Sequence, residues 1–217
     1  FDFFISLEGD LSKLVYLSSK RSSNNFTNRV LKLLSGGIYK GSGFRSINTF
    51  EVSANYTVYD FEDLKPNYSS YAFRQFSITD STTINLSSGL HLNIYGYLKL
   101  SEQGEFRWKD FSMKPGRFVK ETLLLPNIAT SYEGIDFSVG LRYFSLVTYG
   151  FNKSIREMDS DYYSLGPTSM VRYGTDKIMI GFSGWFDFIT QKNKNSEGFL
   201  LNRDSYTNIN FDLDWYF

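Results

Sequence analysis

Apolar and polar side chains alternate at every second position through most of the chain. In residues 135–151 the odd positions are largely apolar and the even positions largely polar or glycine, apart from Phe144 and Leu146. Successive residues of a β-strand point to opposite faces, so a period of two predicts strands with one apolar face. The same alternation recurs in residues 49–58, 90–100 and 178–190.

This alternation, together with the turn residues between the runs, predicts eleven strands. Their ranges are 1–8, 11–20, 28–40, 44–60, 69–86, 90–101, 117–132, 135–151, 162–173, 178–190 and 204–217. Strands of soluble proteins usually hold about 5–6 residues, whereas a strand that crosses a bilayer needs about 9–11. Most of the runs are therefore long enough to cross a membrane. The pattern is weakest in 11–20, 28–40 and 117–132, where Pro126 predicts a bulge or an edge.

The connections between these runs are of two kinds. Short turns occupy residues 8–10, 87–89, 133–134 and 174–176. Longer polar connections occupy residues 20–28, 61–69, 101–117, 152–161 and 191–203. The two kinds largely alternate, with only residues 41–43 left open. Short turns at one end and long loops at the other are typical of transmembrane β-barrels.

The last ten residues, NINFDLDWYF, carry the alternation to the final position. They resemble the C-terminal signature of bacterial outer-membrane β-barrel proteins, in which an aromatic residue ends the last strand after apolar residues at every second position. The resemblance implies a multi-pass barrel in the outer membrane of a Gram-negative bacterium, surrounded by lipid and lipopolysaccharide. The Asn-, Ser-, Tyr- and Lys-rich loops are similar to those of Bacteroidetes proteins. The resemblance also implies that the barrel assembly machinery reads an insertion signal made of Ile209, Phe211, Leu213, Trp215 and Phe217.

We therefore expect an all-β fold, a transmembrane antiparallel up-and-down β-barrel of about 10–12 strands, as a single domain over residues 1–217. Such barrels hold an even number of strands and close by pairing the last strand with the first. Eleven predicted strands mean either a misplaced boundary or further strands before residue 1. In the second case the chain would be the C-terminal part of a larger barrel. A soluble β-sandwich is the alternative fold.

Composition narrows the function. Lys and Arg number 23, as do Asp and Glu, a balance that argues against a nucleic-acid-binding protein. The chain has no cysteine and therefore no thiolate metal site or cysteine nucleophile. Aromatic residues make up 18% of the chain although its mean hydropathy is only −0.29. The sequence shows no phosphate-binding loop, zinc-ligand set or dinucleotide fingerprint, so we expect no metal and no cofactor.

The polar sides of the predicted strands carry charges of both signs and large aromatic residues. These charges would tune the selectivity of a polar channel, or they would pair and plug a narrow lumen; both interpretations stay open. The inward aromatic side chains Tyr95, Tyr97, Phe144 and Trp185 favour the narrow lumen. The lumen-lining candidates are Glu51, His91, Lys99, Asp136, Arg142, Arg172, Asp187, Asp212 and Asp214.

His91 is the only histidine and lies near Ser87 and Ser88. A histidine base beside a serine nucleophile is the arrangement of a lipid-modifying enzyme. A triad needs a third group, however, and the flanking SSGLHLNIYG does not resemble the histidine motifs of outer-membrane lipases. We therefore interpret His91 as a hydrogen-bonding side chain of the lumen and predict no catalytic residue.

Two polar connections carry candidate chemistry. Glu157, Asp159 and Asp161 could present oxygens to Ca²⁺, but such acidic clusters are more commonly solvated loops. Residues 106–118 mix basic and aromatic side chains, and long loops of that kind often contact partners. The partner-contact candidates there are Arg107, Trp108, Lys109 and Phe111.

Two functions of different classes follow. The first is a porin-like barrel that forms a pore or transport path for small solutes. The second is a structural or scaffolding subunit of a larger outer-membrane complex, which binds other subunits through its long extracellular loops. A lipid-modifying enzyme is a weak third. An open, hydrated lumen would favour the pore, and a plugged lumen with an apolar contact surface would favour the scaffold.

Overall fold

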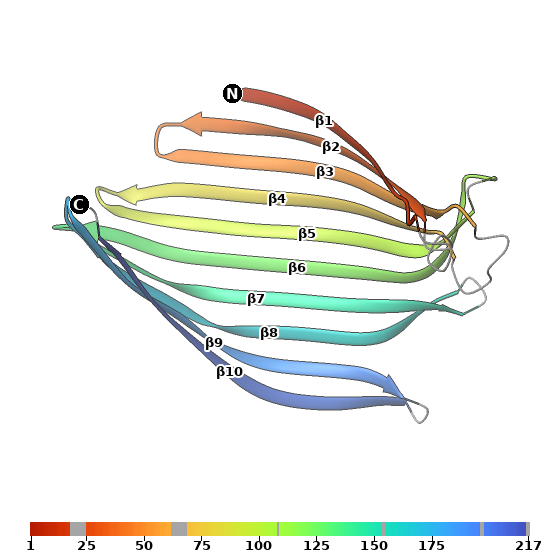
Figure 1. Ribbon diagram of the computed structural model, residues 1–217. Coiled ribbons are helices and arrows are strands. Elements are labelled where there is room, and N and C mark those ends of the chain that lie inside the picture. Colours follow the sequence, from red (N-terminus) through yellow and green to blue (C-terminus); the bar gives the residue numbers. More distant parts are fainter. Residues whose placement is uncertain (18–24, 62–68, 108, 153–154, 196–197, 216–217) are drawn as a thin grey trace.

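A computed structural model describes residues 1–17, 25–61, 69–107, 109–152, 155–195 and 198–215. This part of the chain is all-β and forms one antiparallel sheet in which each strand pairs with the next along the chain (Figure 1). No helix within it is long and apolar enough to cross a membrane. The ten strands are β1 (Asp2–Leu14), β2 (Phe26–Gly41), β3 (Phe44–Tyr59), β4 (Tyr71–Ser87), β5 (Leu90–Arg107), β6 (Ser112–Tyr132), β7 (Ile135–Asn152), β8 (Ile155–Gly174), β9 (Ile178–Asn195) and β10 (Gly198–Trp215).

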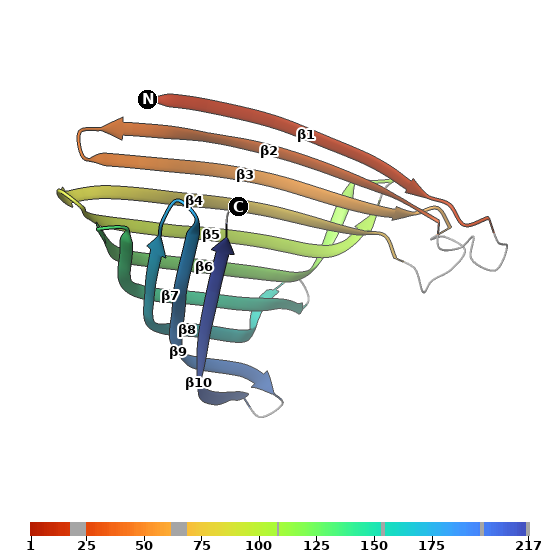
Figure 2. The same ribbon diagram turned by 60° about the vertical axis from the view of Figure 1, so that its left-hand side comes forward.

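The sheet is strongly curved but does not close (Figures 1 and 2). Its strand order runs from β1 to β10 without a crossover, so these two strands are the free edges. The expected pairing of the last strand with the first is therefore not present in the described residues. The up-and-down topology and the strand lengths of 13–21 residues agree with the predicted barrel fold.

The prediction of eleven strands was wrong at the N-terminus. Residues 1–8 and 11–20 were predicted as two strands joined by a turn at Glu8-Gly9-Asp10, but Asp2–Leu14 forms one strand, β1. Residues 18–20 of the second predicted strand lie outside the described residues. Gly9 pairs with Leu31 inside the β1–β2 ladder. A glycine between two acidic residues is a common turn signal, and here it is an ordinary extended residue. With this correction the described residues hold an even number of strands, and Asp2 and Trp215 lie at the same end of the sheet.

The turns at that end are short, as predicted. Glycines with positive φ occupy them at Gly43, Gly89 and Gly134, with φ angles of 85°, 80° and 79°. The connection at residues 41–43, which the sequence left open, is one of these turns. Glycine is favoured there because a Cβ atom disfavours positive φ.

At the opposite end, three of the five predicted long loops are shorter than expected. Residues 101–117, 152–161 and 191–203 are largely strand, because β5 continues to Arg107, β8 begins at Ile155 and β9 continues to Asn195. Polar residues continue the ladder in these hairpins, and polarity alone had suggested loops. The hairpins therefore extend the sheet at this end.

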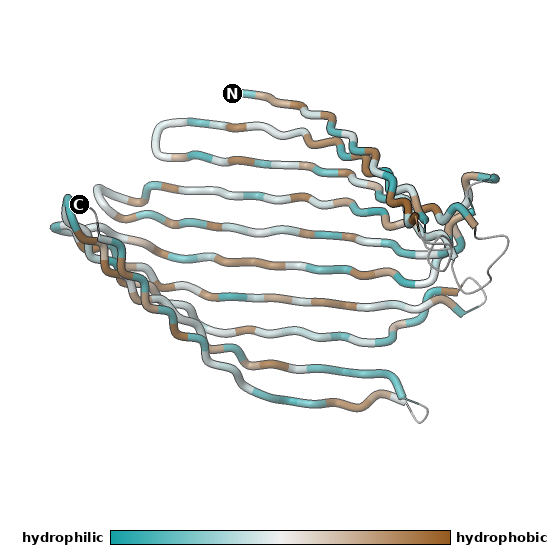
Figure 3. The backbone as a smooth tube through the Cα atoms, viewed as in Figure 1, coloured by the Kyte–Doolittle hydropathy of each residue, from teal (hydrophilic) through white to brown (hydrophobic). Residues whose placement is uncertain are grey.

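The two faces of the sheet differ in polarity. On β10, Phe211 and Leu213 lie opposite Phe182 and Ile180 of β9, which makes an apolar patch on one face. Asp212, between them, points to the other face and lies opposite Gly181. Figure 3 shows the resulting alternation of hydrophobic and hydrophilic residues along most strands.

Buried apolar side chains are few in the part of the chain that the structure describes. They form one cluster of Tyr56, Ala72 and Phe106, packed against Ala54, Val58 and Met113. This cluster lies at the end of the sheet away from the short turns. Many large apolar side chains of the sheet are instead exposed, including Phe182 at 55% and Leu141 at 52%. A sheet with so small a core needs another apolar medium or surface against its apolar face.

Candidate functional site on the concave face

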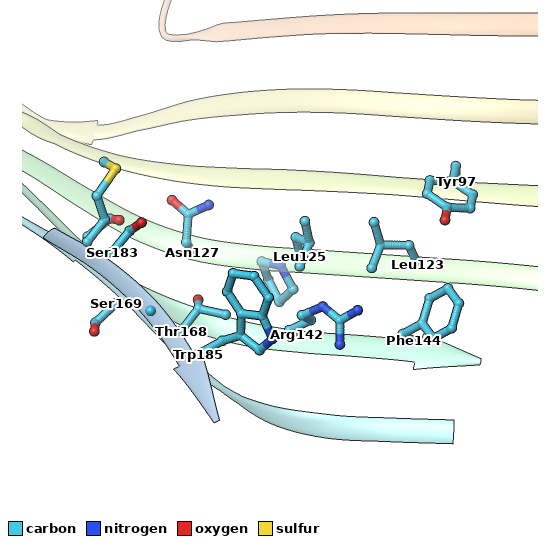
Figure 4. A pocket seen from close by; sticks show the side chains of 14 residues that line it. Tyr97, Leu123, Leu125, Asn127, Arg142, Phe144, Thr168, Ser169, Ser183 and Trp185 are labelled. Atoms are coloured by element: carbon cyan, nitrogen blue, oxygen red, sulfur yellow. The ribbon is translucent and has the colours of Figure 1, made fainter. Parts of the chain in front are cut away.

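A cavity of about 370 Å³ lies on the polar face of the sheet (Figure 4). Side chains from five consecutive strands, β5 to β9, surround it. Strands so far apart can share one cavity only where the sheet curves around it, so we call this polar face the concave face and the apolar one the convex face. The lining residues are Tyr97, Leu123, Leu125, Pro126, Asn127, Ser138, Arg142, Phe144, Thr168, Ser169, Met170, Ser183, Gly184 and Trp185.

Arg142 is the one charged residue of this lining. Its Nη1 atom donates to Asp187 Oδ2 at 2.5 Å and to Ser164 Oγ at 3.0 Å. The guanidinium also lies 5.4 Å from the ring centre of Phe144 and 5.9 Å from that of Trp185. Because an ion pair and two rings constrain it, the guanidinium has a fixed position at the cavity wall.

Gly166 explains how Arg142 of β7 reaches Asp187 of β9 across the strand between them. It lies opposite Arg142 in the β7–β8 ladder. A Cβ atom at Gly166 would lie 1.5 Å from the backbone oxygen of Phe186, so β8 and β9 approach closely only because residue 166 has no side chain.

Asp187 is almost completely buried, with 4% of its surface exposed. One carboxylate oxygen binds Arg142, and the other has no hydrogen-bond partner among the described residues. A buried carboxylate is costly without compensation. Arg142 is therefore the group that compensates the buried Asp187 side chain among the described residues.

A second set of interacting charged side chains lies on β5 and β6, at the edge of the cavity. The hydroxyl of Tyr97 donates to Glu121 Oε1, and Lys99 Nζ lies 3.7 Å from Glu121 Oε2. Farther along the same face, Lys32 Nζ lies 3.3 Å from Glu51 Oε2. Each of these two contacts pairs opposite charges on neighbouring strands.

Uncharged side chains link the strands on the side toward the short turns. Thr83 donates to Asn93 at 2.9 Å, and Asn93 donates to Asn127 at 3.1 Å. Asn127 also lines the cavity. The cavity thus has hydrogen-bonded polar side chains on one side, and aromatic and aliphatic side chains on the others.

The predicted lumen-lining residues share this face by register. Asp136, Arg172 and Asp212 lie in one row across β7–β10, with Gly181 between the last two. Arg142 lines the cavity, and Asp187 of β9 forms an ion pair with Arg142. Their role as lumen lining stays a prediction. The other members placed on this face by the ladders are Glu51, His91, Lys99 and Asp214.

His91 forms a hydrogen bond between its Nδ1 atom and Asn85 Oδ1 at 2.8 Å. This partner is a neutral amide on the neighbouring strand. The arrangement agrees with the interpretation of His91 as a hydrogen-bonding side chain.

The acidic residues interpreted as a loop lie within β8 instead. Glu157 accepts a hydrogen bond of 2.5 Å from Lys194, and this contact lowers the pKa of Glu157 and raises that of Lys194. In the described ranges, no group of three or more His, Asp and Glu residues could hold a metal ion.

Three of the four partner-contact candidates lie at the tip of the β5–β6 hairpin. Arg107 ends β5, Lys109 lies in the turn, and Trp108 lies outside the described residues. Phe111, with φ of 46°, packs its ring 5.4 Å from those of Tyr56 and Phe106. The tip therefore folds back on the sheet instead of extending as a long loop. Contact with a partner stays a prediction.

The proposed insertion signal has four residues in the described part of β10. Ile209, Phe211, Leu213 and Trp215 share the convex face, and each is more than half exposed. Phe217 lies outside the described residues. Recognition by an assembly machinery stays a prediction.

Reasoning from the sequence missed a polar cluster on the convex face. Asp80 accepts hydrogen bonds from Ser46 at 3.2 Å and from Thr82 at 3.0 Å, while Asn48 donates to Ser46 at 2.8 Å. These residues interrupt the apolar face of β3 and β4. The only signal in the sequence is that polar residues occupy otherwise apolar positions of the alternation, at Ser46 and Asn48 and again at Asp80 and Thr82.

Comparison with known proteins gives likeness in structure but not in sequence. No protein-family model and no curated protein matches the chain. The solved copper transporter OprC matches 95% of the chain with a TM-score of 0.60 at 9% identity. The unliganded ferric citrate transporter FecA matches 96% with a TM-score of 0.50 at 14% identity.

This likeness concerns part of each larger protein. The chain spans 36% of the OprC chain and 41% of the FecA chain. At such low identity the likeness is one of fold. The described residues thus have the antiparallel up-and-down sheet found in the barrels of these transporters.

Proposed function

We propose that this chain forms part of the wall of a β-barrel in the outer membrane and that small solutes pass along its concave face. The observation that carries the proposal is the two-faced curved sheet, with exposed apolar side chains on the convex side and the cavity at Arg142 on the concave side. The likeness to two transporters supports it.

The strand lengths fit a membrane-spanning wall. Each strand has at least 13 residues, while a crossing needs about 9–11. Lipid cannot satisfy the backbone groups of β1 and β10, the free edges of the sheet. In a membrane these edges must pair, either with each other or with further strands.

The charge arrangement favours small solutes over strongly selected ions. Lys32 with Glu51, Lys99 with Glu121 and Arg142 with Asp187 pair across strands. Neutralised pairs provide polar surface without a large net potential. A wall of this kind passes solutes by size and hydrogen bonding more than by charge.

Passage is tested with the full-length protein inserted into planar bilayers and into liposomes. We expect discrete conductance steps in the bilayers and uptake of small neutral solutes by the liposomes. The control is protein heated to unfolding before insertion. Silence in both assays, with insertion verified by protease protection, would contradict the transport function.

A scaffolding subunit is the second candidate, and the polar cluster at Asp80 on the convex face favours it. A carboxylate facing lipid is costly, and a protein partner supplying donors would remove that cost. Spin labels at Asn48→Cys and Val52→Cys, on the same face of β3, test this in native outer membranes. Lower oxygen accessibility at residue 48 than at 52 would support a covered site, and equal accessibility would exclude it.

A further inference from the structure

The lining of the cavity at Arg142 combines three kinds of group. Trp185, Tyr97 and Phe144 provide aromatic surface from three strands (Figure 4). Asn127 and Thr168 represent its uncharged hydrogen-bonding side chains. A volume of about 370 Å³ lies within the range of small-molecule sites.

The described part of the lining has no uncompensated charge. Among the residues that the structure describes, Arg142 is the only charged one that lines the cavity, and Asp187 matches it at 2.5 Å. Glu121, which binds Tyr97, is matched by Lys99. An ionic ligand would therefore lose hydration without meeting a free counter-charge. The cavity favours a neutral ligand.

Arg142 still offers donors to such a ligand. In the described part of the chain, its hydrogen bonds are made by Nη1. A guanidinium has five N–H donors, and those on Nε and Nη2 remain for a hydroxyl oxygen. The rings of Phe144 and Trp185 flank this guanidinium.

We propose that this cavity binds a neutral saccharide. A sugar ring has an apolar face of C–H groups, which suits Trp185 and Tyr97, and a rim of hydroxyl groups, which suits Arg142, Asn127 and Thr168. The inference rests on the proposed function, because solute reaches the cavity when the concave face lines a lumen. It adds the chemical class of the solute.

Binding is measured by saturation-transfer NMR and by titration in detergent micelles, with maltose, glucuronate and glucosamine as probes. These three carry related rings with no charge, a negative charge and a positive charge. We expect maltose to bind more tightly than either charged sugar. Loss of ring stacking in Trp185→Ala should weaken maltose binding about fivefold or more.

Two further variants make the result specific. Thr168→Val keeps the shape of the side chain, removes one hydroxyl and should weaken binding of maltose. Tyr206→Ala removes an exposed aromatic residue that lies opposite Asp187 on β10 and does not line the cavity, and it should leave binding unchanged.

The outcomes separate this inference from the transport function. Equal loss in Trp185→Ala and Tyr206→Ala, absence of maltose binding, or equal binding of the charged sugars would overturn the saccharide site. Conductance without maltose binding would leave transport intact and refute this inference alone. Maltose binding with neither conductance in bilayers nor solute uptake by liposomes would retain the site and refute transport.

Discussion

At the scale of residues, the concave face depends on matched polar groups. Asp187 has 4% exposure and one hydrogen-bonded carboxylate oxygen, while the Arg142 side chain keeps 24% exposure. Removing one partner of such a pair costs more stability than removing both, because the remaining buried charge is uncompensated. The pair holds Arg142 at the cavity wall.

Replacement of one member of this pair should destabilise the protein more than replacement of both. We expect Arg142→Met to lower the free energy of unfolding by about 2–3 kcal/mol, discounted for the partial exposure of Arg142. Adding Asp187→Leu should restore much of that loss. Urea unfolding in micelles measures both, and equal or additive losses would show that the two side chains act independently.

From the contact between Glu157 and Lys194 we predict how stability depends on pH. Its hydrogen bond lowers the pKa of Glu157 below the ordinary value of 4.5 and raises that of Lys194 above 10.5. The contact therefore contributes stability between these limits. The contribution of Glu157 is lost as pH falls through its lowered pKa, and that of Lys194 as pH rises through its raised pKa.

Carbon-13 NMR titration of the Glu157 carboxyl measures this effect. We expect its pKa to lie below 4.5 in the wild-type protein and to rise toward that value in Lys194→Gln. Lys192→Gln is the control, because Lys192 lies two residues away on β9. A pKa of Glu157 that does not change in Lys194→Gln would show that the contact is absent in solution.

At the scale of elements, the period of two predicted the strands. Residue types that are common in turns led to wrong boundaries for some of these strands. Gly9 and the polar residues of 191–203 suggested breaks, yet backbone pairing continues through Gly9 and nearly to the tip of the β9–β10 hairpin. Leu123 and Leu125 weakened the alternation of β6 because apolar residues also line the concave cavity. A strand ends where backbone pairing with its neighbouring strand ends. The polarity of a short segment does not show which strand that neighbour is, so it does not predict the strand end.

Two alanine substitutions distinguish a strand glycine from a turn glycine. Gly9→Ala should be neutral or stabilising by up to about 1 kcal/mol, because a Cβ there meets its nearest atom at 3.7 Å. Gly134→Ala should destabilise, because φ is +79° and the Cβ would lie 2.9 Å from Gly174 O. Thermal unfolding of both variants tests this, and a larger loss in Gly9→Ala would restore the predicted turn at residues 8–10.

The candidate site was predictable only in part. Alternation placed Arg142 and Asp187 on one face, but the contact between them crosses β8 and depends on Gly166. The roles of Ser164 and Glu121 require the register of neighbouring strands, which one sequence does not provide. Which residues face each other was thus accessible only after the ladder was known.

At the scale of the whole molecule, the sheet is held together mainly by backbone hydrogen bonds between adjacent strands. Its buried apolar cluster is confined to the end of β3–β6 away from the short turns, and both outer strands have free edges in the described residues. Such a sheet is poorly stabilised in water, whereas lipid on the convex face and polar contents on the concave face would suit each surface. The central claim is therefore that the two faces meet different media.

Single cysteines test that claim directly, because the chain has no native cysteine. Ser138→Cys and Ser183→Cys place a fluorescent label on the concave face, while Val139→Cys and Phe182→Cys place it on the convex face. In liposomes, we predict that a lipid-soluble quencher acts on labels at 139 and 182 and that a water-soluble quencher acts on labels at 138 and 183. Equal access of the water-soluble quencher to neighbouring positions would contradict a membrane-spanning sheet with a polar interior.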